Sequence, residues 1–239
     1  MIFIKAILIF LAMYTLASSA RFWFYLRRAR VLMEATPRKD YVITGGEKKL
    51  TVTILGDSTA VGTGASDYTK TYHYQFLARH ADRYSFDVKN KGVVGARTAD
   101  LARQIESMRE SDIAIITIGG NDVTHGTAWA SVERDLASAL GTVSQKAKRV
   151  VLLTPGDLGD VLIVPYPLRR YWASKSPVLS KLATRVAGDK KITHIDIYAL
   201  GGTQFRDEPY TYYATDLFHP SDAGYKLWAD ALDAKVNFE

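Results

Sequence analysis

The chain has 239 residues, of which 47% are hydrophobic and 23% charged, a length and balance typical of one globular domain with a terminal extension. It contains no cysteine, which excludes disulfides, thiolate catalysis and zinc sites built on cysteine. The net charge is +6, but arginine and lysine gather at residues 21–39, directly after an apolar N-terminus. A membrane surface explains that cluster more simply than nucleic acid does, so nucleic-acid binding is not expected.

The first twenty residues, MIFIKAILIFLAMYTLASSA, carry Lys5 as their single charged side chain and are long enough to cross a bilayer. Aromatic residues in Phe22–Leu26 continue the apolar segment where an interfacial belt would lie. We therefore expect residues 1–26 to be an uncleaved, single-pass membrane anchor; the alternative is a signal peptide cleaved near Ala17–Ala20. The arginines after this segment favour a cytoplasmic position for the main domain, and an extracytoplasmic position is the alternative.

A basic linker at residues 27–49 and one domain at residues 50–239 complete the expected organisation. Within the domain, short apolar runs that predict strands alternate with segments of helical spacing. In chain order we expect strands at 51–55, 84–90, 113–118, 150–153 and 192–197, and helices at 72–81, 99–108, 128–146, 167–187 (interrupted near Pro177) and 220–236. This alternation predicts an open parallel sheet with helices on both faces, in which the polar strand 84–90 lies near an edge.

Small and polar residues gather in four segments at the ends of these elements. Gly56–Ser58 follows the first strand, Gly92–Ala96 the second and Gly119–Asp122 the third, while Asp216–Pro220 precedes the last helix. In open parallel sheets, ligands bind beyond the carboxyl ends of the strands. We therefore expect the four segments to meet at one edge of the sheet.

The residues in these segments permit nucleophilic catalysis by a serine. A serine hydroxyl is a poor nucleophile at neutral pH and needs an adjacent base, commonly a histidine oriented by a carboxylate. Ser58 is the candidate nucleophile, His219 the candidate base and Asp216 the residue that orients it. The backbone N–H groups of Ser58 and Gly95 and the side-chain amide of Asn121 are the candidate donors of an oxyanion hole.

Other interpretations of residues 55–64, LGDSTAVGTG, have less support. No lysine stands where a phosphate-binding loop requires one, and the dinucleotide-binding pattern G-x-G-x-x-G is absent. No paired-histidine motif is present, so neither a metal nor a cofactor is expected. Asp57 is expected to stabilise the turn, Thr59 and Asp122 to support the site, and His125 is near enough to Asn121 in sequence to line a pocket.

Taken together and in this order, the four segments resemble the four blocks of the SGNH (GDSL) hydrolases over residues 55–220. Thr59 departs from the leucine that often follows the serine in that family, and this change affects no catalytic group. The full pattern is most similar to a membrane-anchored bacterial subgroup. The resemblance implies a three-layer α/β/α sandwich with a flavodoxin-like parallel sheet, no metal, and hydrolysis of carboxylic esters or thioesters. It implies the same roles for Ser58, His219 and Asp216, with Ser58, Gly95 and Asn121 as oxyanion donors.

We therefore expect a membrane-anchored esterase that acts on a small-molecule, lipid or acylated-sugar ester through an acyl-enzyme. One alternative is an acyltransferase or deacetylase that uses the same residues on a sugar or a lipid headgroup. Another is a catalytically silent binding module with the same fold. The segments 160–171 and 200–215 are expected to set specificity, and Tyr210, Tyr212 and Tyr213 to flank an acyl or sugar pocket.

Overall fold

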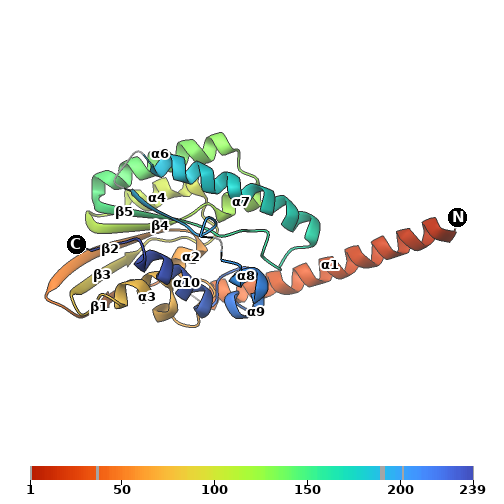
Figure 1. Ribbon diagram of the computed structural model, residues 1–239, viewed down its shortest axis with the longest axis horizontal. Helices are drawn as coiled ribbons and strands as arrows, with labels where there is room; N and C mark the ends of the chain where they lie inside the picture. The colour runs from red at the N-terminus through yellow and green to blue at the C-terminus, as the bar shows by residue number, and fades with distance from the viewer. Residues whose placement is uncertain (1, 36–37, 189–191, 201, 239) are drawn as a thin grey trace.

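A six-stranded sheet in the order β1-β3-β2-β4-β5-β6 organises the structure, a computed structural model that describes residues 2–35, 38–188, 192–200 and 202–238 (Figure 1). The strands are β1 (Tyr41–Ile43), β2 (Lys48–Gly56), β3 (Tyr84–Asn90), β4 (Ser111–Thr117), β5 (Ala147–Thr154) and β6 (Ile192–Asp196). The helices are α1 (Ile2–Ala35), α2 (Ser58–Val61), α3 (Tyr72–Ala78), α4 (Leu101–Glu106), α5 (Gly120–His125), α6 (Trp129–Lys146), α7 (Tyr166–Ala187), α8 (Gln204–Asp207), α9 (Pro209–Tyr212) and α10 (Asp222–Asp233), with 3-10 turns η1 (Tyr68–Lys70) and η2 (Thr98–Asp100).

The strands from β3 to β6 are all parallel, whereas β1 pairs antiparallel with β3 at the edge. The parallel strands, numbered along the chain, follow the 2-1-3-4-5 order of flavodoxin-like folds. In such a sheet the order reverses between the first and third strands, which here are β2 and β4, and ligands bind beyond their carboxyl ends. The predicted fold class is confirmed.

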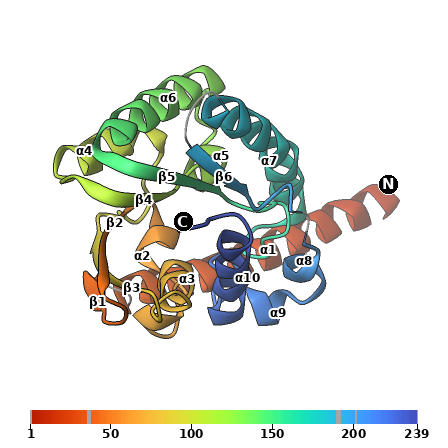
Figure 2. The same cartoon turned by 60° about the vertical axis from the view of Figure 1, so that its left-hand side comes forward.

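Helices cover both faces of the sheet and form the outer layers of the sandwich (Figure 2). On one face α4, α6 and α7 bury Leu101, Leu136 and Leu179 in a common hydrophobic cluster. On the other face α3 and α10 pack together and bury Phe76 and Tyr225 in a second cluster. Both layers cover the centre of the sheet, so the second half of β2 and nearly all of β4 are buried; the apolar run at residues 113–116 in β4 is typical of buried parallel strands.

One expectation about the elements is confirmed and another is wrong. The strand at residues 84–90 lies near an edge of the sheet, next to the short edge strand β1, which falls in the expected linker. The helix at residues 167–187 is not interrupted, since α7 continues through Pro177. A proline inside a helix costs about 3 kcal/mol, but Trp172 and Leu179 on either side of it are buried against the core and hold the helix together.

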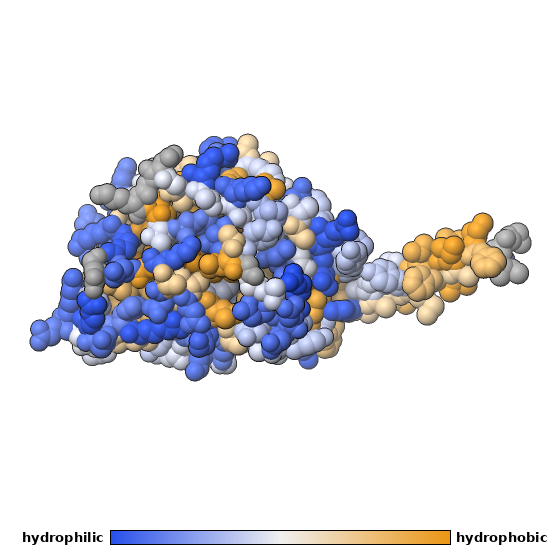
Figure 3. All heavy atoms as spheres, viewed as in Figure 1, coloured by the Kyte–Doolittle hydropathy of each residue, from blue (hydrophilic) through white to orange (hydrophobic). Residues whose placement is uncertain are grey.

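The helix α1 is longer than the expected anchor and ends at Ala35, so the expected boundary at residue 26 falls inside a continuous helix. It is long and apolar enough to cross a membrane by length and composition, a test that a signal sequence near the N-terminus also passes. Its apolar first part projects away from the domain (Figure 3). Its last part packs on the domain, where Ala29 is buried and Phe22 and Tyr25 contact the core.

Candidate active site

The end of β2 presents Ser58 through a turn that requires glycine. Gly56 has a φ of +133°, and a Cβ atom there would lie 2.0 Å from the carbonyl oxygen of Thr117 on β4. The next residue, Asp57, caps α2: its Oδ1 accepts hydrogen bonds from the backbone N–H of Thr59 at 2.9 Å and from the Thr59 hydroxyl at 2.7 Å. Burial raises the pKa of Asp57, and the bonds from Thr59 oppose that rise. The role expected for Asp57 in the turn is confirmed.

A continuous chain of hydrogen bonds links Ser58, His219 and Asp216, which are all buried. Ser58 Oγ lies 2.9 Å from His219 Nε2, and His219 Nδ1 lies 2.6 Å from Asp216 Oδ2. The other carboxylate oxygen, Asp216 Oδ1, accepts from the backbone N–H groups of Phe218 and His219, each at 3.0 Å. Leu217, directly after Asp216, has a φ of +56°, a conformation that is rare for leucine. This tight turn brings the carboxylate and the imidazole face to face.

The hydrogen-bond network determines which nitrogen of His219 carries the hydrogen in the neutral ring. An ionised carboxylate can only accept, so Nδ1 donates to Asp216 Oδ2. Nε2 is then left as the acceptor for the Ser58 hydroxyl. The geometry therefore suits proton transfer from Ser58 Oγ to His219 Nε2.

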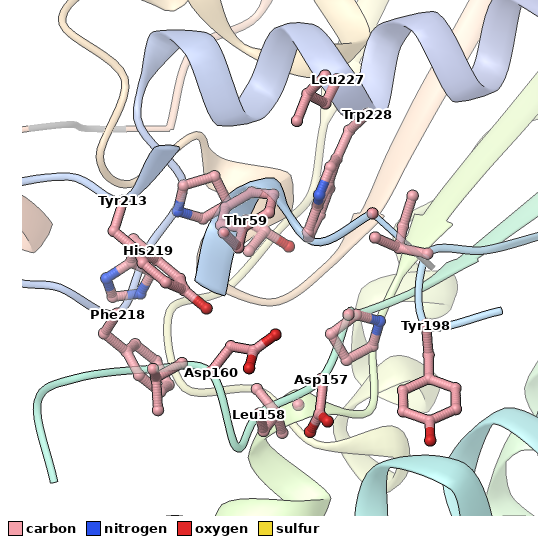
Figure 4. Close-up of a pocket in the computed structure, with 18 of the residues that line it drawn as sticks. Thr59, Asp157, Leu158, Asp160, Tyr198, Tyr213, Phe218, His219, Leu227 and Trp228 are labelled. Carbon is pink, nitrogen blue, oxygen red and sulfur yellow. The ribbon is translucent and has the colours of Figure 1, made fainter. Parts of the chain in front are cut away.

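Ser58 and His219 lie in the wall of a cavity of about 440 Å³, a size that suits small ligands. Ser58, His219 and Asn121 all line it. Asp157 and Asp160, from the loop after β5, also line the cavity, and Figure 4 shows the carboxylate of Asp160 pointing into it. Burial, followed by the nearby charge of Asp157, raises the pKa of Asp160. Within the described ranges, no group of three or more His, Asp or Glu side chains could hold a metal ion.

The other two expected oxyanion donors come from neighbouring loops. The side-chain amide of Asn121, at the start of α5, donates to the carbonyl of Ala96 at 3.0 Å, which fixes its position relative to the loop after β3. Gly95 precedes Ala96 and has a φ of +78°, but a Cβ atom there would meet nothing within 4 Å. Its backbone conformation, rather than lack of space, therefore accounts for glycine. Gly95 is not among the residues that line the cavity.

Asp122, the residue after Asn121, links α5 to the turn η2. It is fully buried and accepts from the backbone N–H of Thr98 at 3.0 Å and from the Thr98 hydroxyl at 3.1 Å. Burial raises the pKa of Asp122, and the bonds from Thr98 oppose that rise. His125, which the sequence suggested could line a pocket, is exposed and is not among the residues that line this cavity. Its Nδ1 lies 2.8 Å from the Asn121 carbonyl oxygen.

The tyrosines expected to flank the pocket lie in different surroundings. Tyr213 is buried and lines the cavity. Tyr210 is 77% exposed on α9. Tyr212 contacts the ring of Phe205, which lines the cavity, but is not itself a lining residue. Of the three, Tyr213 is thus placed to contact a bound substrate.

Sequence reasoning missed Gln104, whose amide holds the residue before Asp57. Gln104 Oε1 accepts from the Gly56 N–H at 2.8 Å, and its Nε2 donates to the Gly56 carbonyl at 2.9 Å. The side chain is buried on α4. Helical spacing places residue 104 on the same face as Leu101 and Ile105, so a polar residue at an apolar position was the available signal.

The substitution Gln104→Met should lower the free energy of unfolding by about 1–3 kcal/mol, because the buried Gly56 N–H loses its side-chain partner and the Gly56 carbonyl keeps only the bond from the Val93 N–H. Urea denaturation would measure this loss. Arg103→Met, on the exposed face of the same helix, is the control and should change stability little. A Gln104→Met protein as stable as the wild type would contradict this assignment.

A buried histidine, His73, forms hydrogen bonds to both α2 and β1. His73 Nε2 donates to the Ala60 carbonyl at 3.2 Å, and its Nδ1 accepts from the Tyr41 hydroxyl of β1 at 2.7 Å. Burial lowers the pKa of His73 to about 4. The ring is therefore neutral at pH 7 and serves as a structural link between β1 and the Ser58 helix.

The pKa of His73 predicts a loss of stability in mild acid. An unfolded histidine titrates near pH 6.5, so between that pH and about pH 4 the unfolded chain binds a proton that the folded protein excludes. Unfolding should thus become easier as the pH falls, by about 2 kcal/mol between pH 7 and pH 5. Urea titrations at both pH values would measure the change. In His73→Gln, which keeps an acceptor and a donor but does not titrate, this part of the pH dependence should disappear; an undiminished dependence would refute the assignment.

The fold is a flavodoxin-like α/β sheet, and the hydrogen-bonded side chains of Ser58, His219 and Asp216 lie beyond the carboxyl ends of its central strands, where such folds bind ligands. The model of the GDSL-like lipase/acylhydrolase family matches residues 54–227. The chain belongs to this family and is a carboxylic ester hydrolase that acts on small-molecule esters. The resemblance seen in the four sequence segments is confirmed.

The chain is also similar to individual proteins. The chain is 26% identical over 216 residues to the GDSL-like esterase Rv1075c of Mycobacterium tuberculosis, covering 83% of this chain and 69% of that protein. Among solved structures, the acetylxylan esterase Axe2 of Geobacillus stearothermophilus matches with a TM-score of 0.59 and 21% identity, over 82% of this chain and 97% of Axe2. The lipase Lip_vut3 from a goat rumen metagenome matches with a TM-score of 0.57 and 21% identity, over 77% of this chain and 96% of that chain.

Proposed function

We propose that the protein hydrolyses carboxylic esters through an acyl-enzyme formed on Ser58, with His219 as general base and Asp216 as the group that orients it. The observation that carries this proposal is the pair of short contacts, 2.9 Å from Ser58 Oγ to His219 Nε2 and 2.6 Å from His219 Nδ1 to Asp216 Oδ2. Their position in the wall of a cavity of about 440 Å³ supports it, because a substrate carbonyl can reach Ser58 there.

The reaction proceeds in two halves. Ser58 Oγ attacks the ester carbonyl carbon while its proton passes to His219 Nε2, and Asp216 stabilises the imidazolium that forms. The Ser58 and Gly95 N–H groups and the Asn121 amide donate to the negatively charged oxygen. The tetrahedral intermediate collapses, the ester C–O bond breaks, and the leaving alcohol takes the proton from Nε2. Water then attacks the acyl-enzyme by the same steps and releases the acid.

The same three residues could also cleave a thioester or transfer the acyl group to an alcohol. A thioester would acylate Ser58 in the same way with a thiol as the leaving group. An alcohol on a sugar or a lipid headgroup could replace water as acceptor. Axe2, which shares the fold, is an acetylxylan esterase, and a sugar deacetylase is therefore the natural second candidate. Adding glycerol to the assay would separate hydrolysis from acyl transfer, because a transferase would yield glyceryl ester at the expense of free acid.

Covalent labelling tests the proposal directly. A fluorophosphonate should label the wild-type protein and leave Ser58→Ala unlabelled, because the reagent reacts with an activated serine. Ser180→Ala is the control: Ser180 is also buried and bonded to a carboxylate, at 2.5 Å from Asp196 Oδ2, but has no histidine partner in this contact. Labelling should persist in this variant. A folded wild-type protein that neither reacts with the reagent nor hydrolyses p-nitrophenyl acetate would favour the silent binding module.

We also propose that α1 is retained as a single-pass membrane anchor. Packing of Phe22, Tyr25 and Ala29 on the core supports this, because a signal segment has no need to fit the mature domain. The arginines after residue 20 favour a cytoplasmic domain. A reporter fused after Glu239 that is active on one side of the membrane would test the orientation.

A further inference from the structure

The helix α1 changes character at Arg21. The side chains of Phe3–Ala20 are almost all exposed, although most of them are apolar. From Phe22 onwards the less exposed side chains recur at helical spacing, at Phe22, Tyr25, Leu26, Ala29, Leu32 and Met33. The first stretch is about 27 Å long at about 1.5 Å per residue, close to the ~30 Å of a bilayer's hydrocarbon core. The second stretch is an amphipathic helix that docks on the domain.

Hydrogen bonds join this docked part of α1 to two loops that also build the cavity. Arg21 donates to the Leu162 carbonyl at 3.1 Å, and Arg28 donates to the Thr215 carbonyl at 3.3 Å. The neighbour of Leu162, Val161, lines the cavity, and Thr215 directly precedes Asp216. The loops are themselves joined, because the Leu162 N–H donates to the Leu217 carbonyl at 3.0 Å. The cavity is therefore held at a set distance from the point where α1 leaves the domain.

The first turns of α7 lie beside this point. α7 begins four residues after Leu162, and Figures 1 and 2 both show its first turns on the side from which α1 emerges and its last turns on the far side. Tyr166, Leu168 and Tyr171 are exposed there, with Arg170 among them. Exposed aromatic and aliphatic side chains with arginine are typical of a surface at the level of lipid headgroups.

We propose that residues 166–171 of α7, together with Arg21 of α1, form a membrane-docking surface that holds the cavity against the bilayer. Arginine at this level complements anionic headgroups, and the apolar side chains enter the boundary with the acyl chains. The substrate class that follows is an amphiphilic ester, which enters the cavity from the bilayer surface rather than from solution. This inference rests on the proposed ester hydrolysis and specifies where its substrate comes from.

The position of the surface can be measured without any assay of activity. Because the chain contains no cysteine, Leu168→Cys and Val178→Cys each give one site for an environment-sensitive fluorophore. Both residues lie on α7 and are equally exposed, at 39% and 38%, but Val178 is about 15 Å further along the helix. The full chain would be reconstituted in vesicles of phosphatidylcholine and phosphatidylglycerol that contain nitroxide-labelled lipid. The Leu168→Cys probe should be quenched and the Val178→Cys probe should not.

Equal quenching at both positions, or no quenching at position 168, would overturn the docking surface and favour an exposed patch that contacts protein. Either result would leave the proposed ester hydrolysis intact.

A second experiment tests whether the membrane-docking surface affects the rate of ester hydrolysis. Leu168→Asp should lower hydrolysis of p-nitrophenyl palmitate incorporated in the vesicles by about tenfold, which corresponds to about 1.4 kcal/mol, and should leave hydrolysis of soluble p-nitrophenyl acetate unchanged. Val178→Asp should alter neither rate. If Leu168→Asp lowered both rates equally, or neither, the docking surface would not serve substrate entry. If the wild type failed to hydrolyse p-nitrophenyl acetate, the proposed function itself would be wrong.

Discussion

The variant His219→Ala should lose about six powers of ten in kcat for p-nitrophenyl acetate, the loss observed when the base of a serine–histidine pair is removed. Without the imidazole, the proton of Ser58 Oγ has no acceptor at 2.9 Å, and the hydroxyl reverts to a poor nucleophile. Initial rates at saturating substrate, divided by the concentration of folded protein, would measure the effect.

Two further variants make this test specific. His80→Ala removes a histidine that pairs with Asp233 on the surface, away from the cavity, and should retain wild-type turnover. The double variant Ser58→Ala/His219→Ala should be no slower than either single variant, because residues that act as one unit give non-additive losses. Additive losses would mean that the two side chains act independently, contrary to the proposed mechanism.

A smaller but more informative loss, about 10⁴-fold in kcat, is expected for Asp216→Asn. In the wild type, the backbone N–H groups of Phe218 and His219 donate hydrogen bonds to Asp216 Oδ1. In the variant they would donate to the amide oxygen of the asparagine and so fix its orientation. Its NH₂ group would then face His219 Nδ1, which would have to accept. The hydrogen would move to Nε2, and that atom could no longer accept the proton of Ser58.

The surface variant Asp230→Asn, which loses an ion pair with Arg79 and does not line the cavity, provides the control and should keep kcat. Asp216→Asn should keep the wild-type fold, since asparagine is nearly isosteric with aspartate. If it turned over substrate at the wild-type rate, the Asp216 carboxylate would have no part in orienting His219.

The sheet could be predicted from the sequence because its central strands are short apolar runs buried on both faces, such as residues 113–118. The edge strand β1 could not, because Tyr41–Ile43 has too few residues to show a period, and its pairing with β3 depends on contacts distant in sequence. Pro177 was misleading for a related reason. Local propensity favours a break there, and burial of the residues on both sides outweighs it.

The candidate site was predictable as a set of residues but not as a geometry. Chemistry and order pointed to Ser58, His219 and Asp216, and the structure brings these three together. The positive φ of Leu217, which turns the carboxylate toward the imidazole, has no sequence signal because leucine rarely adopts it. Gln104 has a weak signal, a polar residue on a buried helix face, which gains meaning once α4 is seen to cover Gly56.

The short strand β1 has a practical consequence for anyone who prepares the soluble domain alone. A chain shortened to begin at residue 50, the boundary that the sequence suggests, would remove Tyr41–Ile43 and leave the unpaired backbone of β3 as a new sheet edge. Such an edge invites pairing between molecules, so the shortened protein should aggregate on concentration. It would also deprive His73 of its Tyr41 partner. Beginning at Arg38 instead retains both features, and light scattering of the two preparations would show the difference.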